Sequence, residues 1–261
     1  MLELYQFELS QYSEKVRFIL DYKGLAYRKI EVTPGVGQLE LFLLSGQRQV
    51  PVLKDGNRVI ADSTSIAMYL EENYPEKPII PLQSTRKALC LMMEEWADES
   101  IGTKSRKVLF GGLSKDMNLR NSVLPSNTPD FLKNILTNVP RELVDILGFG
   151  VGLSPEAVKA AEKALKQDLE ALCLLLKDSP YLTGDTPTLA DLSVAGLSLL
   201  LKFPSGPYLN IPENMRGKGV PGFADNPEYE TFFQWRDRFY TDYRRPIYAS
   251  SPSSPNSIEI E

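Results

Sequence analysis

The chain has 261 residues, of which 43% are hydrophobic and 24% charged, a composition typical of globular proteins with one large or two small domains. Its formal net charge of −5 argues against a nucleic-acid-binding surface, because such surfaces concentrate Lys and Arg. Histidine is absent, which excludes Ser-His and Cys-His nucleophiles, histidine general bases and histidine metal ligands.

The two cysteines, Cys90 and Cys173, lie far apart in separate helical patterns and have no metal-ligand spacing around them. They are expected to be free, buried thiols of a protein in a reducing compartment. The N-terminal residues show no basic and apolar leader, and no apolar run approaches the ~18 residues of a membrane span. We therefore expect a soluble cytoplasmic protein without a metal site, a nucleic-acid partner or a membrane partner.

The first elements are predicted from hydrophobic period and stop signals. Residues Leu2–Phe7 alternate with period two, which predicts a strand. A helix follows over about Ser13–Lys23, because Gly24 stands where helices commonly end. A second strand over Ala26–Val32 and a short helix over Leu39–Leu44 come next.

A third strand begins at the run Gln49-Val50-Pro51-Val52-Leu53. An X-Pro bond costs only about 0.5–1 kcal/mol more in cis than in trans, so a cis peptide is expected between Val50 and Pro51. Such a turn leaves the backbone of Val50 facing outward instead of into the strand ladder. Two apolar runs around Asp55-Gly56 then predict a β-hairpin over Leu53–Ile60.

The polar segment Asp62-Ser63-Thr64-Ser65 begins another helix, because short polar side chains favour the N-cap position. Apolar positions recur every four residues along this helix, at Ile66, Leu70 and Tyr74. Free backbone N–H groups and the positive end of the helix dipole lie at its start. We therefore expect Ser63 and its neighbours to face a carboxylate.

The predicted order β-α-β-α-β-β-α is the layout of a thioredoxin-like domain, with a parallel pair joined by a right-handed crossover and an antiparallel hairpin. After a proline-rich linker only helical patterns appear. The predicted fold class is therefore α/β plus all-α. A thioredoxin-like domain is expected over residues 1–80, an all-helical domain over 84–249 and a disordered tail over 250–261.

The expected cis-proline strand, its hairpin partner and the Asp-Ser helix together resemble the glutathione-binding half of the soluble glutathione S-transferases. The resemblance rests on Gln49, Val50, Pro51, Asp62 and Ser63 in this spacing. It implies glutathione as co-substrate, with Gln49 at its glycine end and the backbone of Val50 paired to its cysteine residue. It also implies that Asp62 and Ser63 take the γ-glutamyl ammonium and carboxylate.

The helical part matches the same family at one point and otherwise shows ordinary helix signals. In the family a Thr-x-x-Asp capping box precedes a buried helix, and Thr188-Leu-Ala-Asp191 has that spacing. Ser154-Pro155-Glu156 is a helix start followed by an apolar stripe of more than five turns. A last helix near Pro227 has aromatic residues that are expected in the core: Phe232, Phe233, Trp235 and Phe239.

The turn after the first strand is where the resemblance places the chemistry. The run Leu9–Arg17 is similar to the Ser-Ser-Cys-Ser-x-Arg-Val-Arg motif of serine-type transferases of the zeta kind, with Ser10 at the active serine. Conjugation needs a thiolate, and lowering a thiol pKa from about 8.5 by ~2 units requires ~2.7 kcal/mol of differential stabilisation. A serine hydroxyl hydrogen bond and a helix N-terminus can together supply this.

Alternatives to Ser10 as the activating group stay open. Ser10 or Ser13 could simply cap the helix. Tyr5 and Tyr12 are rivals, because tyrosine has the activating role in other branches of the family. Tyr5 lies one residue out of the tyrosine register, and Tyr12 stands where a packing aromatic is usual.

The resemblance implies a detoxification enzyme that joins glutathione to a small electrophile, or uses it for isomerisation or peroxide reduction, and that forms a homodimer. A non-catalytic binding or assembly module is the alternative, because fold does not fix function. The electrophile is expected between the two domains. There residues 111–152, rich in Gly, Asn, Ser and Pro, depart from the family as an insertion.

Overall fold

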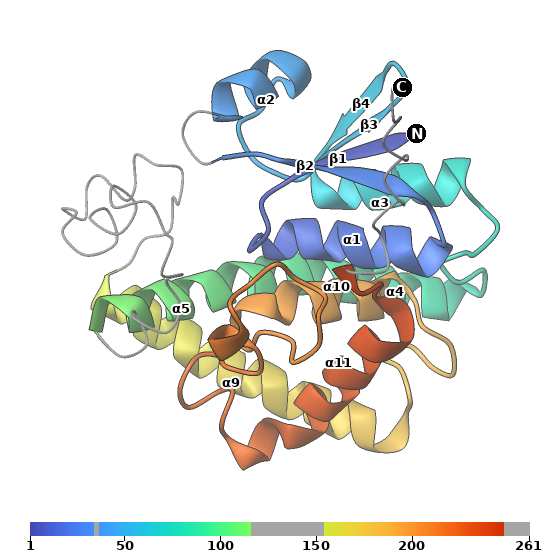
Figure 1. Ribbon diagram of the computed structural model, residues 1–261. Helices are drawn as coiled ribbons and strands as arrows, with labels where there is room; N and C mark the ends of the chain where they lie inside the picture. Colours follow the sequence, from blue (N-terminus) through green and yellow to red (C-terminus); the bar gives the residue numbers. More distant parts are fainter. Residues whose placement is uncertain (34–36, 116–153, 248–261) are drawn as a thin grey trace, which may run out of the picture.

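The computed structural model describes residues 1–33, 37–115 and 154–247 (Figure 1). The elements of the first part alternate between strand and helix before the chain becomes helical. In order they are β1 (Leu2–Gln6), α1 (Gln11–Lys23), β2 (Tyr27–Glu31), α2 (Gly37–Ser45), β3 (Val52–Asp55), β4 (Arg58–Ala61) and α3 (Ser63–Asn73).

The strands form one mixed sheet in the order β2-β1-β3-β4. β1 runs parallel to β2, so the chain must cross over between them through α1. β3 runs antiparallel to β1 and to β4, and the β3–β4 turn contains Gly56 at a φ of 58°. The predicted thioredoxin-like order is confirmed, including the hairpin around Asp55-Gly56.

Helices cover both faces of the sheet, with α1 and α3 on one face and α2 on the other (Figure 1). The α2 face has a small core of its own, built from Val32, Leu41 and Val52. The α1 face continues into the large core of the helical domain. Gly24 ends α1 at a φ of 77°, a left-handed conformation that glycine adopts without steric cost, as its position predicted.

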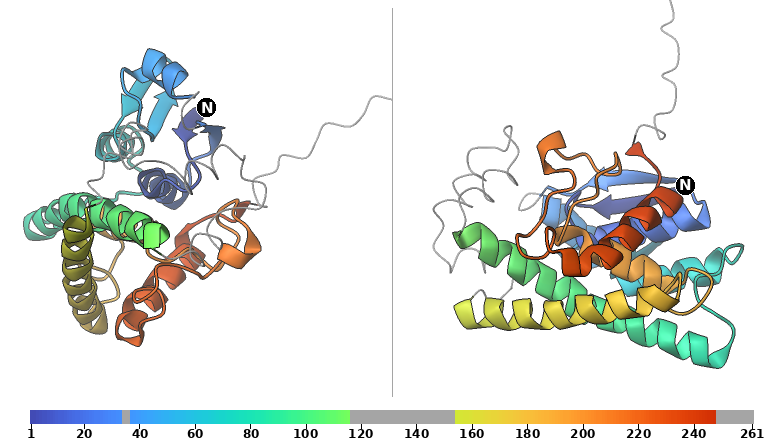
Figure 2. Two further views of the ribbon diagram at one scale, coloured as in Figure 1. Left: turned by 90° about the vertical axis from the view of Figure 1, so that its left-hand side faces the viewer. Right: turned by 90° about the horizontal axis from the view of Figure 1, so that it is seen from below.

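The helical part packs against α1 and α3 rather than against the sheet (Figures 1 and 2). Figure 2 shows α5 and α9 side by side, and α9 also packs against α11. The elements are α4 (Ser84–Trp96), the π-helical η1 (Ala97–Gly102), α5 (Thr103–Lys115), α9 (Pro155–Asp178), α10 (Leu189–Leu197), the short 3-10 turns η3 (Ser198–Leu200), η4 (Glu213–Met215) and η5 (Pro227–Tyr229), and α11 (Glu230–Tyr243).

Helices α1 and α10 approach each other closely at Gly196. A Cβ atom on Gly196 would lie 2.6 Å from the backbone N of Lys15, so the residue must be small here. This contact joins the two parts of the chain at the level of the first turns of α1. Helix α10 is buried on all sides, since every residue from Leu189 to Leu197 is inaccessible to solvent.

Most predicted helix signals of the second part are confirmed. Ser154 caps α9 by accepting the N–H of Ala157 at 3.2 Å, and the apolar stripe of α9 is buried. Thr188 and Asp191 form the predicted capping box. The aromatic residues of α11 lie in the core, as expected. Cys90 and Cys173 are free and buried.

Other predictions differ from the structure or lie outside its described residues. The first helix begins at Gln11, not near Ser13, because Ser10 takes the N-cap position. Residues 116–153, which include most of the expected insertion, and the expected tail over 250–261 are outside the described residues. The division at residues 80 and 84 stays a prediction, although it falls between α3 and α4. Within the described ranges, no helix is long and apolar enough to cross a bilayer.

Candidate active site

Three separate stretches of the chain meet at one edge of the sheet. Tyr5 on β1 pairs with Val52 on β3, and Val52 pairs with Ala61 on β4. The end of β1, the start of β3 and the end of β4 therefore lie side by side. The chain enters this edge through residues 49–51 and leaves it through residues 7–10 and 62–63. The structure thus brings the predicted site residues to one place.

Ser10 is the N-cap of α1, where its Oγ accepts the backbone N–H of Ser13 at 3.2 Å. Its own N–H donates to the carbonyl of Phe7 at 2.9 Å and closes the turn after β1. The residue is half-buried. Because Oγ acts as the acceptor in the cap, its hydroxyl hydrogen is free to donate, and no described residue accepts it.

The two rival tyrosines have other surroundings. The Tyr12 hydroxyl donates to the backbone carbonyl of Asp98 at 3.1 Å, and burial raises its pKa above the ordinary value. A Cβ atom on Gly102 would lie 2.8 Å from the Tyr12 Oη, so the ring packs tightly against η1. Tyr5 lies inside β1, paired with Ile30 on β2 and Val52 on β3. Tyr12 therefore joins α1 to the helical domain.

The entry into β3 has the backbone geometry that the sequence predicted. The Val50–Pro51 peptide bond is cis. Strand pairing begins at Val52, so the backbone of Val50 lies outside the ladder. Gln49 is exposed, Val50 is half-buried and Pro51 is buried. This places an unpaired length of backbone beside the end of β1.

Asp62 and Ser63 start helix α3. Asp62 is the N-cap, and its Oδ1 accepts the N–H of Ser65 at 2.9 Å. It is the non-glycine residue with positive φ, at 79°, in the described part of the chain. A residue held in such a conformation costs about 1–3 kcal/mol, and such residues cluster at ligand clamps and active sites. Ser63 is buried as the first residue of the helix.

A buried ionic cluster behind α3 was missed by the sequence analysis. The Nζ of the fully buried Lys15 lies 3.1 Å from the Thr64 Oγ1 and 2.8 Å from the Asp98 carboxylate, and it also binds Glu94. Burial raises the pKa of Asp98. The spacing of Glu94 and Asp98, four residues apart in a helical stretch, was the available signal, because it places both acids on one face. The cluster fixes the first turn of α3 beside α1.

A second buried cluster lies on the opposite side of α1. Glu14 binds Arg17 on its own helix and Arg244 just after α11, where Arg244 Nε lies 2.9 Å from the Glu14 carboxylate. Arg244 also pairs with Asp21. Burial by itself raises the pKa of Glu14, but the two arginines outweigh it and lower the pKa to about 2. Glu14 is therefore ionised at neutral pH.

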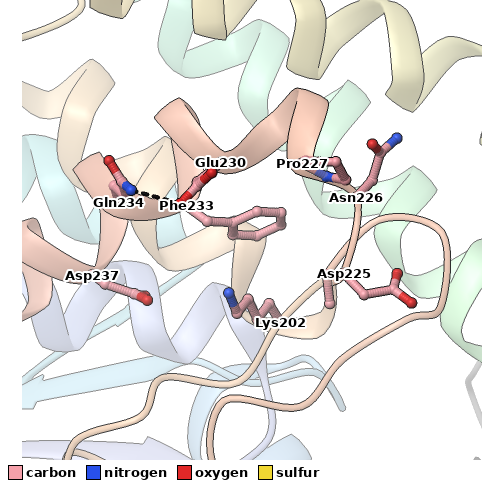
Figure 3. A pocket seen from close by; sticks show the side chains of 9 residues that line it. Lys202, Asp225, Asn226, Pro227, Glu230, Phe233, Gln234 and Asp237 are labelled. Carbon is pink, nitrogen blue, oxygen red and sulfur yellow. Dashed lines mark hydrogen bonds between the residues drawn. The ribbon is translucent and has the colours of Figure 1, made fainter.

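A hollow of about 330 Å³ lies elsewhere, between α11 and the segment that precedes η5 (Figure 3). Figure 3 shows Phe233 and Lys202 on its walls, and the Lys202 Nζ lies 5.0 Å from the Phe233 ring centroid. Acidic side chains at its rim are Asp225, Glu230 and Asp237. It contains none of the predicted site residues, and its own lysine covers the aromatic face.

Two family profiles match this chain, one in each of its parts. The family profile described as "Glutathione S-transferase, N-terminal domain" matches residues 4–78, and the one described as "Glutathione S-transferase, C-terminal domain" matches residues 143–212. A "Glutathione S-transferase zeta class" of Euphorbia esula is 42% identical over 91 residues, which are 34% of this chain and 40% of that protein. The match therefore spans about two fifths of such relatives.

Two further proteins are similar to this chain over a larger share of its length. A "Stringent starvation protein A homolog" of Haemophilus ducreyi is 24% identical over 166 residues, 59% of this chain and 77% of that protein. The crystal structure of a beta-etherase from Sphingobium sp. strain SYK-6 superposes with a TM-score of 0.67 at 21% identity, covering 92% of this chain and 94% of the other. At this identity the superposition shows a common fold.

The two family profiles match one domain each and together cover more than half of the chain. The matched ranges agree with the thioredoxin-like sheet and with the helical part that begins after α3. The chain belongs to the glutathione S-transferase family.

Proposed function

We propose that the protein is a glutathione transferase in which the Ser10 hydroxyl donates a hydrogen bond to the glutathione thiolate. The observation that supports this best is the geometry of Ser10. Its Oγ accepts the Ser13 N–H at the N-terminal end of α1, so its hydroxyl hydrogen can point away from the helix. A sulfur placed there would receive that hydrogen and would lie at the positive end of the helix dipole.

The required stabilisation is of a size that such a site supplies. Hydrogen bonds to charged groups contribute about 1.5–3 kcal/mol, and a helix N-terminus adds about 0.3–1 kcal/mol for a nearby anion. Together they lower a thiol pKa by about 2 units, which makes thiolate the main form at neutral pH. The serine itself stays protonated, and the thiolate then attacks the electrophile.

Ser10→Ala should leave glutathione affinity nearly unchanged and raise the pH at which the bound thiolate forms. With the donor lost, we expect turnover to fall roughly tenfold or more at pH 6.5 and to recover in part at high pH, since a lost 1.5–3 kcal/mol corresponds to about one to two pKa units. The ultraviolet absorbance of bound thiolate, titrated with pH, measures this directly. A wild-type titration in Ser10→Ala with a shifted one in Tyr12→Phe or Tyr5→Phe would assign the role to a tyrosine.

The rest of glutathione is proposed to bind along the same edge. The backbone of Val50, outside the ladder, is suited to pair with the cysteine residue of the tripeptide as an added strand does. Gln49 is exposed beside it and would reach the glycine end. Asp62 would pair with the γ-glutamyl ammonium, and Ser63 would hold its carboxylate through the hydroxyl as well as the backbone N–H.

Asp62→Ala combined with Ser63→Ala should weaken glutathione binding, because two charge-directed contacts of about 1.5–3 kcal/mol each are lost. Isothermal calorimetry measures the change. Asp62 also caps α3, so Asp62→Asn is the matched control: asparagine keeps an acceptor for Ser65 but has no charge for the ammonium. A weakened Asp62→Asn therefore supports a binding role. Unchanged affinity in the double variant would mean that the site is elsewhere.

The second substrate is proposed to lie between the domains, over Ser10 and against α4, η1 and α5. Tyr12 and Gly102 meet at this interface, where the π-helical η1 replaces regular helix. Such helical irregularities are frequent at functional sites.

The free thiols Cys90 and Cys173 support a reducing compartment such as the cytoplasm.

A homodimer is proposed from the family and from apolar side chains exposed near and along α4. Leu82 is 98% exposed, Met92 69% and Leu89 45%. Groups of exposed large apolar side chains mark interaction surfaces in soluble proteins. Light scattering at micromolar concentration should give about twice the 29.3 kDa mass of one chain, and Met92→Asp should lower it. A wild-type mass near 29.3 kDa would contradict the proposal.

A non-catalytic binding module is the second candidate. It is favoured by one observation, the similarity to a relative named as a stringent starvation protein rather than as a transferase. Two experiments separate the candidates. Retention on immobilised glutathione followed by turnover of a generic aryl halide supports the transferase, whereas retention without turnover supports the module.

A further inference from the structure

The turn that carries Ser10 is held by the side chain of Glu8. The Oε1 of Glu8 accepts the backbone N–H of Asn210 at 2.8 Å. Its Oε2 accepts the side-chain amide of Gln6 at 2.9 Å and lies 3.3 Å from Nη1 of Arg17. One carboxylate therefore contacts the end of β1, helix α1 and a segment of the helical domain.

The main chain of Glu8 is bound as well. Its N–H donates to the carboxylate of Glu31 at 2.9 Å, and its carbonyl accepts from Nη2 of Arg17 at 2.9 Å. Ser10 follows two residues later and closes the turn on the Phe7 carbonyl. Because both the backbone and the side chain of Glu8 are fixed, the position at which the chain reaches Ser10 is fixed too.

The partners of Glu8 are themselves immobile. Arg17 is fully buried and also binds Glu14, which in turn holds Arg244 of the C-terminal segment. Burial raises the pKa of Glu8, but the charges of Arg17 and Lys29 and the N–H of Asn210 bring it below the ordinary value. Glu8 is therefore ionised at neutral pH and able to accept all of these hydrogen bonds.

The chain on the other side of Ser10 is fixed by different residues. Gln11 Nε2 donates to the Gly102 carbonyl at 2.6 Å, and the Tyr12 hydroxyl donates to that of Asp98. These contacts hold the first turn of α1. They do not reach the turn before it, which depends on Glu8.

We propose that Glu8 is a positioning residue for Ser10. Its carboxylate joins the turn before α1 to Arg17 and to the Asn210 backbone, and so sets where the Ser10 hydroxyl lies. The inference rests on the proposed function in so far as Ser10 is the donor to the thiolate. Glu8 would act through its contacts with protein groups, those of Gln6, Arg17 and Asn210, and not as a ligand of glutathione. The helical domain thereby contributes to the active site through a main-chain N–H, a contribution that no side-chain substitution at Asn210 would reveal.

The test uses a reporter at position 10 that needs no glutathione. In Ser10→Cys the new thiol lies at the N-terminal end of α1, where the helix dipole lowers its pKa. Its rate of alkylation by iodoacetamide is followed as a function of pH. Mass spectrometry quantifies the peptide that contains the introduced thiol, so that Cys90 and Cys173 do not contribute. The profile reports how well position 10 is held against the helix end.

Glu8→Asp is the decisive variant, because it keeps the charge but is too short to reach Asn210 and Gln6 together. In the Ser10→Cys background we expect alkylation near pH 7 to slow about two- to fivefold and the profile to move to higher pH, the size of a lost helix-end interaction. Glu3→Asp is the matched control, since Glu3 lies on β1, the strand that leads to this turn, and pairs with Lys54 at 3.3 Å, away from the turn.

Glu8→Gln is the second variant and separates positioning from simple electrostatics. Removing a negative charge by itself favours a thiolate and should speed alkylation, whereas loss of positioning should slow it. Slower alkylation in Glu8→Asp without faster alkylation in Glu8→Gln, and with thermal unfolding like that of Glu3→Asp, supports the proposal. Parent-like alkylation in Glu8→Asp, or faster alkylation in Glu8→Gln, overturns it.

Glutathione assays on the protein with Ser10 intact distinguish this proposal from the proposed function. If wild type forms bound thiolate and Ser10→Ala shifts its titration while Glu8→Asp does not, the function stands and the positioning role fails. If wild type binds no glutathione but Glu8→Asp slows alkylation of the thiol introduced at position 10, the positioning role stands and the proposed function fails. In a transferase with both, Glu8→Asp should lower kcat at pH 6.5, leave KM for glutathione unchanged and have no further effect in Ser10→Ala.

Discussion

Arg244→Met should lower the free energy of unfolding by about 3–5 kcal/mol, because removing one partner of a buried ion pair leaves uncompensated charge in the interior. Arg244 is 4% exposed and holds two carboxylates of α1, those of Glu14 and Asp21. Methionine fills a similar length but donates no hydrogen bond. Urea denaturation at pH 7, followed by far-ultraviolet circular dichroism, measures the loss.

The same variant should also become more sensitive to acid. The pKa of Glu14 is about 2 in the folded protein, against an ordinary value of 4.5. The stability that this difference supplies is fully present above pH 4.5 and is lost as pH falls towards 2. Without Arg244, Glu14 retains only Arg17 of its two arginine partners, so its folded pKa rises and acid unfolding should begin at higher pH.

Arg238→Met is the matched control for Arg244→Met. Arg238 is an exposed residue of α11, near Arg244 in sequence. Surface substitutions of this kind usually change stability by about 0.5 kcal/mol or less. Equal losses in the two variants would mean that the buried pairs of Arg244 contribute no more than a surface arginine, and the assignment of its role would be wrong.

Asp191→Ala should destabilise the protein by about 2–6 kcal/mol, since two buried N–H groups lose their acceptor and each such loss costs about 1–3 kcal/mol. The Asp191 carboxylate accepts the N–H of Leu182 and that of Thr188, each at 2.8 Å. It lies at the start of α10, the helix that packs on α1. Equilibrium unfolding in urea measures the effect.

Asp191→Asn separates the hydrogen bonds from the charge. Burial raises the pKa of Asp191 to about 6, and the backbone N–H groups of Leu182 and Thr188 lower it only in part. A raised carboxyl pKa means that the folded state binds the proton more tightly, so stability decreases as pH rises from about 3.8 to about 6. The asparagine side chain of this variant cannot titrate, so this decrease should disappear. Its persistence would assign the pH dependence to another group.

The fold could be read from the sequence because its boundaries carry local signals. Gly24 ends α1, Asp55-Gly56 turns the hairpin, and Ser154 begins α9, each through backbone chemistry that operates over a few residues. The start of α1 was misplaced because Ser10 and Ser13 are equally good caps in sequence. Only the turn that Ser10 closes on Phe7 decides between them.

The sequence predicted the residues of the candidate site but not the buried ion pairs that hold them in place. Ser10, Val50 and Asp62 stand in turns and caps, which sequence spacing indicates directly. The burial of Lys15 and Glu14 could not be predicted, because charged residues in an amphipathic helix normally face solvent. Their partners are distant in sequence, as with Glu14 and Arg244, which are separated by 230 residues. No local pattern encodes such pairs.

The buried cluster around Lys15 has a consequence for how the protein folds. Its ammonium comes from the thioredoxin-like part and its carboxylates, Glu94 and Asp98, come from the helical part. Separating the two parts would break these ion pairs and expose the apolar residues of both parts that share one core, such as Phe18 and Tyr240. We therefore expect the two parts to unfold in one cooperative transition although they differ in architecture, and the edge of the sheet beside Ser10 to form only when both parts are folded.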